Sequence, residues 1–582
     1  MSSRPLAVGV ALSVVLLPCA LYAQNQGGSS GCVPGHEANC APGELPFEEF
    51  ITGPPENLGT SSVPPVSERP LDPNSGERIP VRHFVVEGVT ANPEANITPE
   101  KVQAAADAAF AQLTGGASAV ELTVGQMVKV SDAVTVYYRN NGYIVAKAFL
   151  PVQDIGPDGT VKIQVLEGRV SAVVVEGAKN YSKSVLAKSS EPLVGHAPTR
   201  DGVESAVLYA QDNPGVRLFG TFKPGAHTGD TDFVLQVLNE DRFEFSGGAD
   251  NFGTKFTGQY RLQAGAAWNN PIGLGDELNL SALESVSPTN DTFGSLAYRV
   301  PVGPPGLGVS ASASRNAFSV TGSGLDILQL EGTIYDYELG TDWRFKRSRF
   351  LNETAGLNVA HKDSTLTAVG GKLSITKDRY DVASLTGGFD RVDTRFKGLD
   401  QVSGDFRHGL DGTVGTGGKL KPNFNVYELR YNRLQALTET QTAVLRFRTQ
   451  YTSDSLVPLE KFSPSGPDGV RAYPVGDYLR DKGRFVSLEY RVQAPFFAQA
   501  AGPFGRSWGD LLQFWLFGDD ARVSDVQSGA STLTGYGASM QFSVPGRFTF
   551  LVQGAKPTSY NKTPASDGKN GVRIYGQLSV KL

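Results

Sequence analysis

The chain has 582 residues, which is too long for one ordinary domain, so two or more domains are expected. Its 67 Gly, 31 Phe and 20 Tyr accompany only 19% charged residues, so the chain can bury a core and is not disordered. The formal net charge of −6 shows no basic excess, which disfavours nucleic acid as a partner.

Residues 1–23 have the features of a secretory signal peptide. Arg4 gives a positive start, residues 6–17 form an apolar run, and Ala23 precedes a cleavage point. The run is short for a membrane-spanning helix. A lipoprotein signal through Cys19 is the weaker alternative, because Pro18 occupies a position where a small residue is wanted. We therefore predict that the chain is exported.

Residues 24–80 are predicted to form an extended periplasmic arm or linker. They are rich in Pro, Gly, Ser and Glu, and such a segment cannot bury enough surface to order itself well. Cys32 and Cys40 close a short polar loop, and an oxidising compartment favours a disulfide between them. Metal binding through His36 is the alternative, but two Cys and one His fall short of a closed zinc site.

Residues 81–241 carry a repeated pattern of strand, helix, helix, strand and strand. Thr98 and Pro99 mark the start of the first helix, and Thr123 with Gln126 has capping-box spacing at the start of the second. The tripeptide Val-Glu-Gly occurs at residues 86–88 and again at 175–177, and it is predicted to mark the same turn in each repeat. The sequence therefore predicts two small α+β modules, at residues 81–170 and 171–241.

Residues 242–582 lose the helical signals and alternate with a period of two. Leu488 and Tyr490, for example, oppose Ser487, Glu489 and Arg491. A soluble β-sandwich also alternates. However, the alternating runs last about nine to eleven residues, which is enough for a tilted strand to cross a bilayer. The Arg and Lys residues in the middle of these strands also need a water-filled lumen or partner charges. We predict an all-β transmembrane antiparallel barrel.

This order of parts resembles the haemolysin secretion/activation family, the outer-membrane transporters of two-partner secretion. The resemblance implies that the α+β modules are POTRA domains and that the barrel has sixteen strands. The most specific match in the first module is "YRNNGYIVAKAFLPVQDI" followed by "GTVKIQVLEGRV". The residues at the family's positions are Tyr138, Gly142, Tyr143, Pro151, Gln153, Glu167 and Gly168. An alternative interpretation is that these residues only cap a helix and turn a hairpin.

The second match is the stretch "GPDGVRAYPVGDYLRDKG", residues 466–483, which reads as a loop but carries apolar and aromatic residues. The family has a Val-Arg-Gly-Tyr/Phe tetrad on a long extracellular loop that folds back into the barrel, and a Phe-x-Asp-x-Gly motif on an inward-facing strand. The residues at these positions are Val470, Arg471, Ala472 and Tyr473 in the loop and Phe517, Asp519 and Ala521 in the strand.

We expect Arg471 to pair with Asp519, because a guanidinium inside a lumen needs a carboxylate and offers it a planar fork. A solvated arginine on an outer loop is the alternative. Ala472 and Ala521 both replace a family glycine. Either the loop tip lies slightly further from the wall, or the positive φ of the glycine is not needed here.

The resemblance implies export of one large, β-helical partner exoprotein across the bacterial outer membrane, with the modules in the periplasm. Outer-membrane lipid and the barrel assembly machinery are the other expected partners.

The sequence shows no motif of an enzyme site. In "GTVGTGGKLKP" the residue after Lys419 is Leu420, which does not fit a phosphate loop. No nucleophile elbow occurs and the six histidines are scattered. We predict no catalytic residue, cofactor or metal, and no enzyme activity. A barrel-assembly factor, a passive porin, and a periplasmic enzyme or adhesin are the alternatives.

Overall fold

The computed structural model describes residues 75–117, 119–322, 326–415, 420–527, 529–558, 565, 568 and 570–582. The predicted signal peptide and residues 24–74 of the predicted arm, with Cys32 and Cys40, lie outside these residues. The predicted end of the arm at residue 80 is too late, because strand β1 already begins at Ile79. The chain divides into two compact units, one ending at Glu240 and one running from Asp241 to Leu582.

The first α+β module pairs two helices with a small sheet in the strand order β2-β5-β4. Thr98 caps the first helix, and Thr123 and Gln126 form the predicted capping box on the second. A further pair of three-residue strands, β1 with β3, was not predicted, because three residues are too short to show a period. The elements are β1 (Ile79–Val81), β2 (His83–Glu87), α4 (Pro99–Thr114), β3 (Val120–Leu122), α5 (Val124–Asn140), β4 (Lys147–Phe149) and β5 (Thr160–Leu166).

The second module repeats the arrangement, with the strand order β6-β8-β7. In each sheet the first strand pairs parallel and the last pairs antiparallel with the central strand. Its first strand begins at Arg169, two residues before the predicted boundary. The elements are β6 (Arg169–Glu176), α6 (Lys183–Ala187), α7 (Arg200–Gln211), β7 (Val216–Pro224) and β8 (Asp230–Glu240).

The repeated tripeptides do mark one equivalent turn, as the sequence predicts. Gly88 has φ +83° and Gly177 has φ +84°, a conformation that favours glycine. A Cβ on Gly88 would lie 2.6 Å from the Val165 carbonyl oxygen, and one on Gly177 would lie 2.7 Å from that of Val237. Both positions therefore require glycine for the same two reasons.

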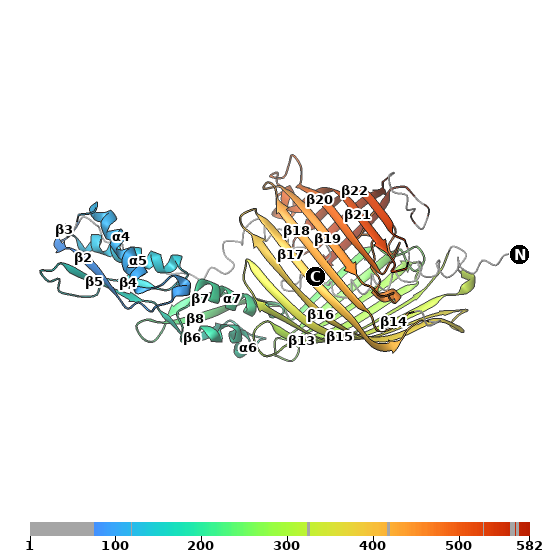
Figure 1. The fold of residues 1–582 in the computed structure, drawn as a ribbon, viewed down its shortest axis with the longest axis horizontal. Helices are drawn as coiled ribbons and strands as arrows, with labels where there is room; N and C mark the ends of the chain where they lie inside the picture. The colour runs from blue at the N-terminus through green and yellow to red at the C-terminus, as the bar shows by residue number, and fades with distance from the viewer. Residues whose placement is uncertain are drawn as a thin grey trace. The chain divides into compact units, whose positions relative to one another are not determined.

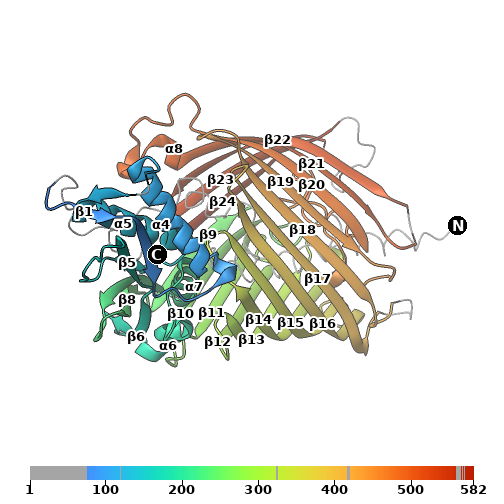
Figure 2. The ribbon, with the colours of Figure 1, turned by 60° about the vertical axis from the view of Figure 1, so that its left-hand side comes forward.

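Sixteen strands within the described residues form one closed antiparallel barrel (Figures 1 and 2). The last strand pairs with the first, from Gln577 opposite Asp250 to Lys581 opposite Ser246. The strands are β9 (Phe243–Asp250), β10 (Tyr260–Asn269), β11 (Glu277–Ser287), β12 (Asp291–Pro301), β13 (Leu307–Ser319), β14 (Glu331–Lys346), β15 (Leu351–Ala368), β16 (Leu373–Asp393), β17 (Gly398–Thr413), β18 (Asn425–Ala436), β19 (Gln441–Tyr451), β20 (Lys482–Gln493), β21 (Leu512–Ser524), β22 (Ser531–Val544), β23 (Phe548–Pro557) and β24 (Arg573–Lys581).

The alternation of the sequence corresponds to the two faces of this wall. Leu488, Tyr490 and Leu516 are exposed on the outside, whereas Glu489 and Asp519 are buried on the inside. The predicted length of about nine to eleven residues holds for β10, β11, β12, β19, β23 and β24, whereas β13 to β18 and β20 to β22 are longer and β16 reaches 21 residues. None of the helices in the described ranges is both long and apolar enough to cross a membrane.

Candidate functional site

Residues 452–481 connect β19 to β20, and their contacts with inward-facing residues of the wall place them in the barrel lumen. Phe462 and Arg480 pair through their backbones and hold the two arms of this loop together. At its tip the predicted tetrad is almost completely buried, and its partners lie on inward faces of β20 to β24. The tetrad is therefore neither solvated nor outside the barrel. We call residues 452–481 the lumen loop.

Arg471 at the tip of the lumen loop meets Asp519 of β21, the pairing expected from the sequence. Its Nε donates to Asp519 Oδ2 at 2.9 Å and its Nη2 donates to Oδ1 at 2.7 Å, a two-pronged contact. The Arg471 backbone N–H also donates to Oδ2 at 3.1 Å. Both side chains are almost completely buried. This geometry is the strong, directional form of an arginine–carboxylate pair.

The sequence did not indicate the rest of the environment of Arg471. Its Nη1 donates to Glu489 Oε1 at 2.9 Å, and its Nη2 donates to Ser487 Oγ at 2.9 Å. Gln553 of β23 accepts a longer bond at 3.3 Å. Alternation places these three residues on inward faces, but only the barrel's register brings them to one point.

Phe517, the first residue of the strand motif, lies under the Arg471 guanidinium. The guanidinium carbon is 3.3 Å from the centre of the ring, a close cation–π contact. A Cβ on Gly537 of the neighbouring strand β22 would lie 2.5 Å from Phe517 Cζ. The ring therefore occupies space that only a glycine in β22 leaves open.

Ala472 fits the wall because another glycine lies opposite it. A Cβ built on Gly535 of β22 would collide with the Ala472 methyl group. Ala472 is not among the described non-glycine residues with positive φ, so a glycine's conformational freedom is not used at this position. Arg573 Nε donates to the Ala472 carbonyl at 2.8 Å, and Tyr575 OH donates to that of Tyr473 at 2.9 Å.

Val470, Ala472 and Tyr473 pack with Phe517 and Ala521 in one apolar cluster on the inner wall. The second replaced glycine, Ala521, is fully buried in this cluster. The loop tip is thus held both by apolar packing and by hydrogen bonds.

A second anchor of the lumen loop lies at Glu460, a residue that the sequence analysis does not predict to belong to the site. Its side chain is completely buried and accepts hydrogen bonds from Lys362 Nζ at 2.8 Å and Arg407 Nη1 at 2.6 Å. Tyr380 OH donates to it at 3.1 Å. These partners lie on β15, β16 and β17, whereas Arg471 contacts β20, β21 and β23. The loop is therefore fixed to two different sectors of the wall.

Three of the predicted residues in the first module, Tyr138, Tyr143 and Glu167, are linked by one hydrogen bond and one ring contact. Tyr138 OH donates to Glu167 Oε1 at 2.9 Å, and the rings of Tyr138 and Tyr143 meet edge to face at 5.7 Å. Glu167 Oε1 also accepts from the Thr90 N–H at 2.8 Å. Burial, together with the nearby Glu167 carboxylate, raises the pKa of Tyr138 above its usual value, so the phenol stays a donor.

The other predicted residues of the module shape its backbone. The Gln153 side chain donates to the Lys162 carbonyl at 2.8 Å and accepts from the Lys162 N–H at 2.7 Å, so it pairs with β5 as a strand would. Pro151 begins this turn, and Gly142 and Gly168 have φ of +94° and +72°. These contacts agree with the interpretation that the signature caps a helix and turns a hairpin.

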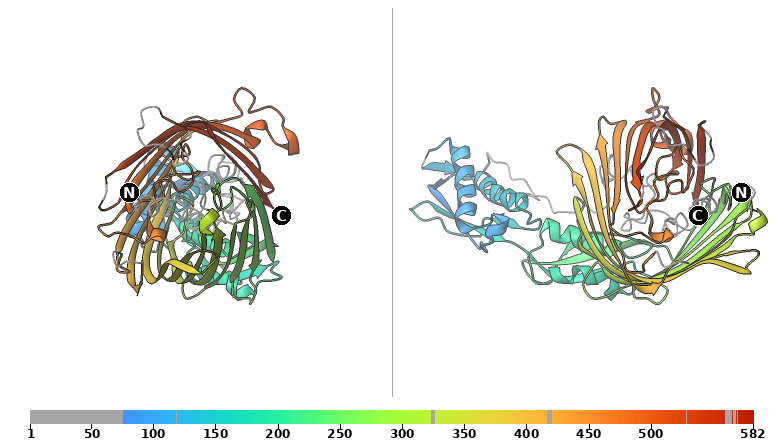
Figure 3. Two further views of the ribbon diagram at one scale, coloured as in Figure 1. Left: turned by 90° about the vertical axis from the view of Figure 1, so that its right-hand side faces the viewer. Right: turned by 45° about the vertical axis from the view of Figure 1, so that its right-hand side comes forward.

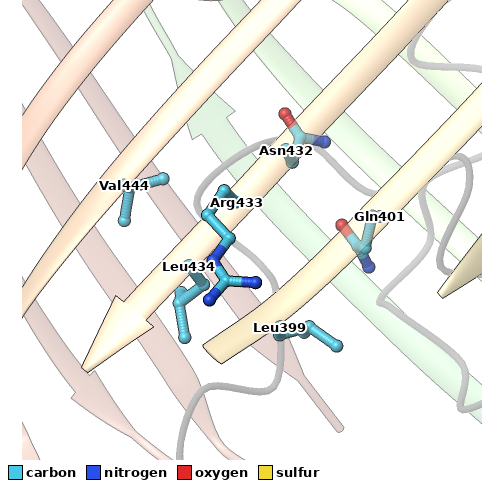
Figure 4. A pocket seen from close by; sticks show the side chains of 6 residues that line it. All are labelled: Leu399, Gln401, Asn432, Arg433, Leu434 and Val444. Atoms are coloured by element: carbon cyan, nitrogen blue, oxygen red, sulfur yellow. The ribbon is translucent and has the colours of Figure 1, made fainter. Parts of the chain in front are cut away.

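A small pocket lies between β17, β18 and β19 (Figure 4). Arg433 is its charged lining residue and already binds Asp400 at 2.8 Å and Asp393 at 3.0 Å. Leu399, Leu434 and Val444 form much of the remaining lining. Arg433 therefore links β18 to β16 and β17, and its charge is already paired.

Comparisons with known proteins match this arrangement. A family model described as "Haemolysin secretion/activation protein ShlB/FhaC/HecB" matches residues 229–504, and one described as "POTRA domain, ShlB-type" matches residues 79–168. The chain is 26% identical over 466 residues to the heme/hemopexin transporter protein HuxB of Haemophilus influenzae, covering 76% of this chain and 79% of that protein.

Two solved structures share the fold. The structure of CdiB from Escherichia coli aligns with a TM-score of 0.65 at 19% identity, covering 90% of this chain and 94% of that one. The structure of CdiB from Acinetobacter baumannii aligns with a TM-score of 0.60 at 16% identity, covering 97% and 99%.

Proposed function

This chain belongs to the haemolysin secretion/activation family of outer-membrane transporters, and from that premise we propose how it exports its partner. It is a β-barrel transporter of two-partner secretion, with its POTRA region in the periplasm. The buried Arg471–Asp519 contact carries the proposal, because it fixes the lumen loop in the path that an exported chain must take.

We propose that the lumen loop is a latch with two anchors. Arg471 holds its tip to β21, and Glu460 holds its first arm to β15 and β17. An exported chain passes only after the tip leaves the wall. Charged and polar groups suit this role, because an aqueous lumen and a passing polypeptide can replace their partners when the loop moves.

The periplasmic region captures the unfolded N-terminal part of the exoprotein. We assign residues 1–23 to a signal peptide, the residues from 24 up to the start of β1 at Ile79 to an arm, and the second module, like the first, to the POTRA class. A strand of the exoprotein would add to a sheet edge. On the edge strand β2, the Gln103 side chain occupies two backbone groups that an added strand would use. It accepts from the Val86 N–H at 3.0 Å and donates to the Phe84 carbonyl at 2.8 Å. An added strand at β2 must displace Gln103.

Movement through the barrel uses no nucleotide, and folding of a β-helical exoprotein at the cell surface makes it one-way. The chain itself reaches the membrane through the barrel assembly machinery and is held there by outer-membrane lipid. The transporter acts without a cofactor or an enzymatic step.

The proposal is tested by expressing this chain with the exoprotein of its own system in a heterologous Gram-negative host. We expect the exoprotein to reach the surface or medium only when the barrel is present. Accumulation in the periplasm despite an abundant, folded barrel would contradict the proposed export.

A further inference from the structure

The connection between β20 and β21, residues 494–511, is far longer than the other turns at its end of the barrel. β9 follows the periplasmic region directly, so the end where β9 begins faces the periplasm. The other connections at this end, 270–276, 302–306, 347–350, 394–397, 437–440 and 545–547, have three to seven residues, whereas 494–511 has 18. We call residues 494–511 the periplasmic flap.

Backbone hydrogen bonds and a short helix give the periplasmic flap a defined structure. The Trp508 N–H donates to the Ala500 carbonyl at 3.0 Å, and the Gly509 N–H donates to that of Ala498 at 2.8 Å. A short helix, α8 (Trp508–Leu511), starts with a capping box formed by Ser507 and Asp510. The flap therefore presents its side chains in fixed directions.

The flap bends onto the outer face of the barrel. The Trp508 ring lies 6.4 Å from Phe542, and the Phe504 ring lies 6.3 Å from Phe548. Phe542 and Phe548 are on the outward faces of β22 and β23, the faces that also carry the exposed Tyr536 and Phe550. Figure 3 (left) shows this segment, in orange, standing outside the ring of strands. The flap is thus continuous with the lipid-facing surface.

Two exposed phenylalanines of the flap have an unusual backbone conformation. Phe496 has φ +74° and Phe504 has φ +61°, a region that a bulky side chain rarely adopts. Both side chains are exposed, Phe496 completely. Local strain of this kind persists where the surrounding structure enforces it, and it gathers at binding sites. Here two aromatic rings are exposed on one ordered connection, and the Phe504 ring lies beside Phe548 on the outward face of β23.

We propose that the periplasmic flap is a membrane-interface anchor that inserts Phe496 and Phe504 into the phospholipid of the periplasmic leaflet. Aromatic side chains prefer the headgroup level of a bilayer, and barrels carry girdles of them at both interfaces. Arg506 and Arg547 are exposed at the same edge and suit anionic headgroups. Phospholipid is the occupant because the flap continues the surface that lipid already covers.

The anchor is tested by site-directed spin labelling of the full chain in bilayers of phosphatidylethanolamine and phosphatidylglycerol. The three native cysteines are replaced by serine. A nitroxide is attached at Phe496→Cys and, in a second variant, at Phe504→Cys. Two controls carry it at Leu516→Cys, on the lipid-facing wall, and at Glu439→Cys, exposed in a short turn at the same end.

We expect the Phe496 and Phe504 labels to collide more with oxygen, which concentrates in lipid, than with a polar nickel chelate, as the Leu516 label does. The Glu439 label should show the reverse order. Flap labels that behave like the Glu439 label overturn the proposal. Flap labels shielded from both reagents also overturn it, since they indicate a protein contact. Neither result depends on export, so the anchor can fail while the transport function stands.

Discussion

Arg471 and Asp519 lie 48 residues apart in the chain, yet three hydrogen bonds join them inside the barrel. One guanidinium and one carboxylate are thereby almost fully removed from water. Two buried charges are tolerated only as a pair, and removal of one partner from such a pair typically costs about 3–5 kcal/mol. The contact therefore fixes the tip of the lumen loop to β21.

Asp519→Asn keeps the shape of the strand motif but removes the charge that Arg471 needs. We expect it to lower the temperature at which the folded barrel loses its compact migration in gel electrophoresis. Asp520→Asn is the matched control, because the neighbouring side chain points to the opposite face of β21. An equal shift in both variants would show that Asp519 has no special role.

Glu460→Gln should loosen the first arm of the lumen loop, because it leaves the buried Lys362 and Arg407 without their shared carboxylate. We expect more frequent or larger openings in single-channel recordings across planar bilayers. Glu439→Gln, in an exposed turn, is the control and should leave the recordings unchanged. Unaltered conductance for Glu460→Gln would mean that the tip alone holds the loop.

Gly535→Ala should displace the loop tip, because the new methyl group collides with Ala472. Overpacking of this kind typically costs about 1–3 kcal/mol. Gly518→Ala on the adjacent strand is the control, since a methyl group there meets nothing within 4 Å. The prediction is a lower thermal transition for Gly535→Ala only. Identical transitions for the two variants would contradict the close fit of Ala472 against β22.

The sequence predicted those features that depend on residues close together in the chain. Capping at Thr123 and the inward position of Glu489 follow from spacing and alternation alone. The pairing of Arg471 with Asp519 came from two family motifs. Convergence of Ser487, Glu489 and Gln553 on one guanidinium depends on the register of strands, which a period of two does not specify.

The contacts of Glu460 also could not be predicted from the sequence. It lies outside any motif, and its partners come from three strands that precede it by 53 to 98 residues. The exposed phenylalanines of the periplasmic flap have positive φ, a conformation that phenylalanine rarely adopts, so the sequence does not predict it. Such positions become visible only when the chain is folded.

Gln103→Ala should expose the Val86 N–H and Phe84 carbonyl on the edge of β2. If the exoprotein adds a strand there, the variant should bind its N-terminal region more tightly, because no side chain must be displaced first. Binding can be measured with the full chain in detergent by surface plasmon resonance. Gln112→Ala, exposed on the same helix, is the control. Weaker or unchanged binding would place capture at another edge.

Export of the exoprotein from cells carrying Arg471→Ala tests whether the Arg471 contact belongs to the transport mechanism. Barrel abundance and heat-modifiability are measured in parallel, and Arg522→Ala, on the outer face of β21, serves as the control. We predict that export is lost or strongly altered while the folded barrel remains in the outer membrane. Normal export with a folded Arg471→Ala barrel would contradict the latch and reduce Arg471 to a packing residue.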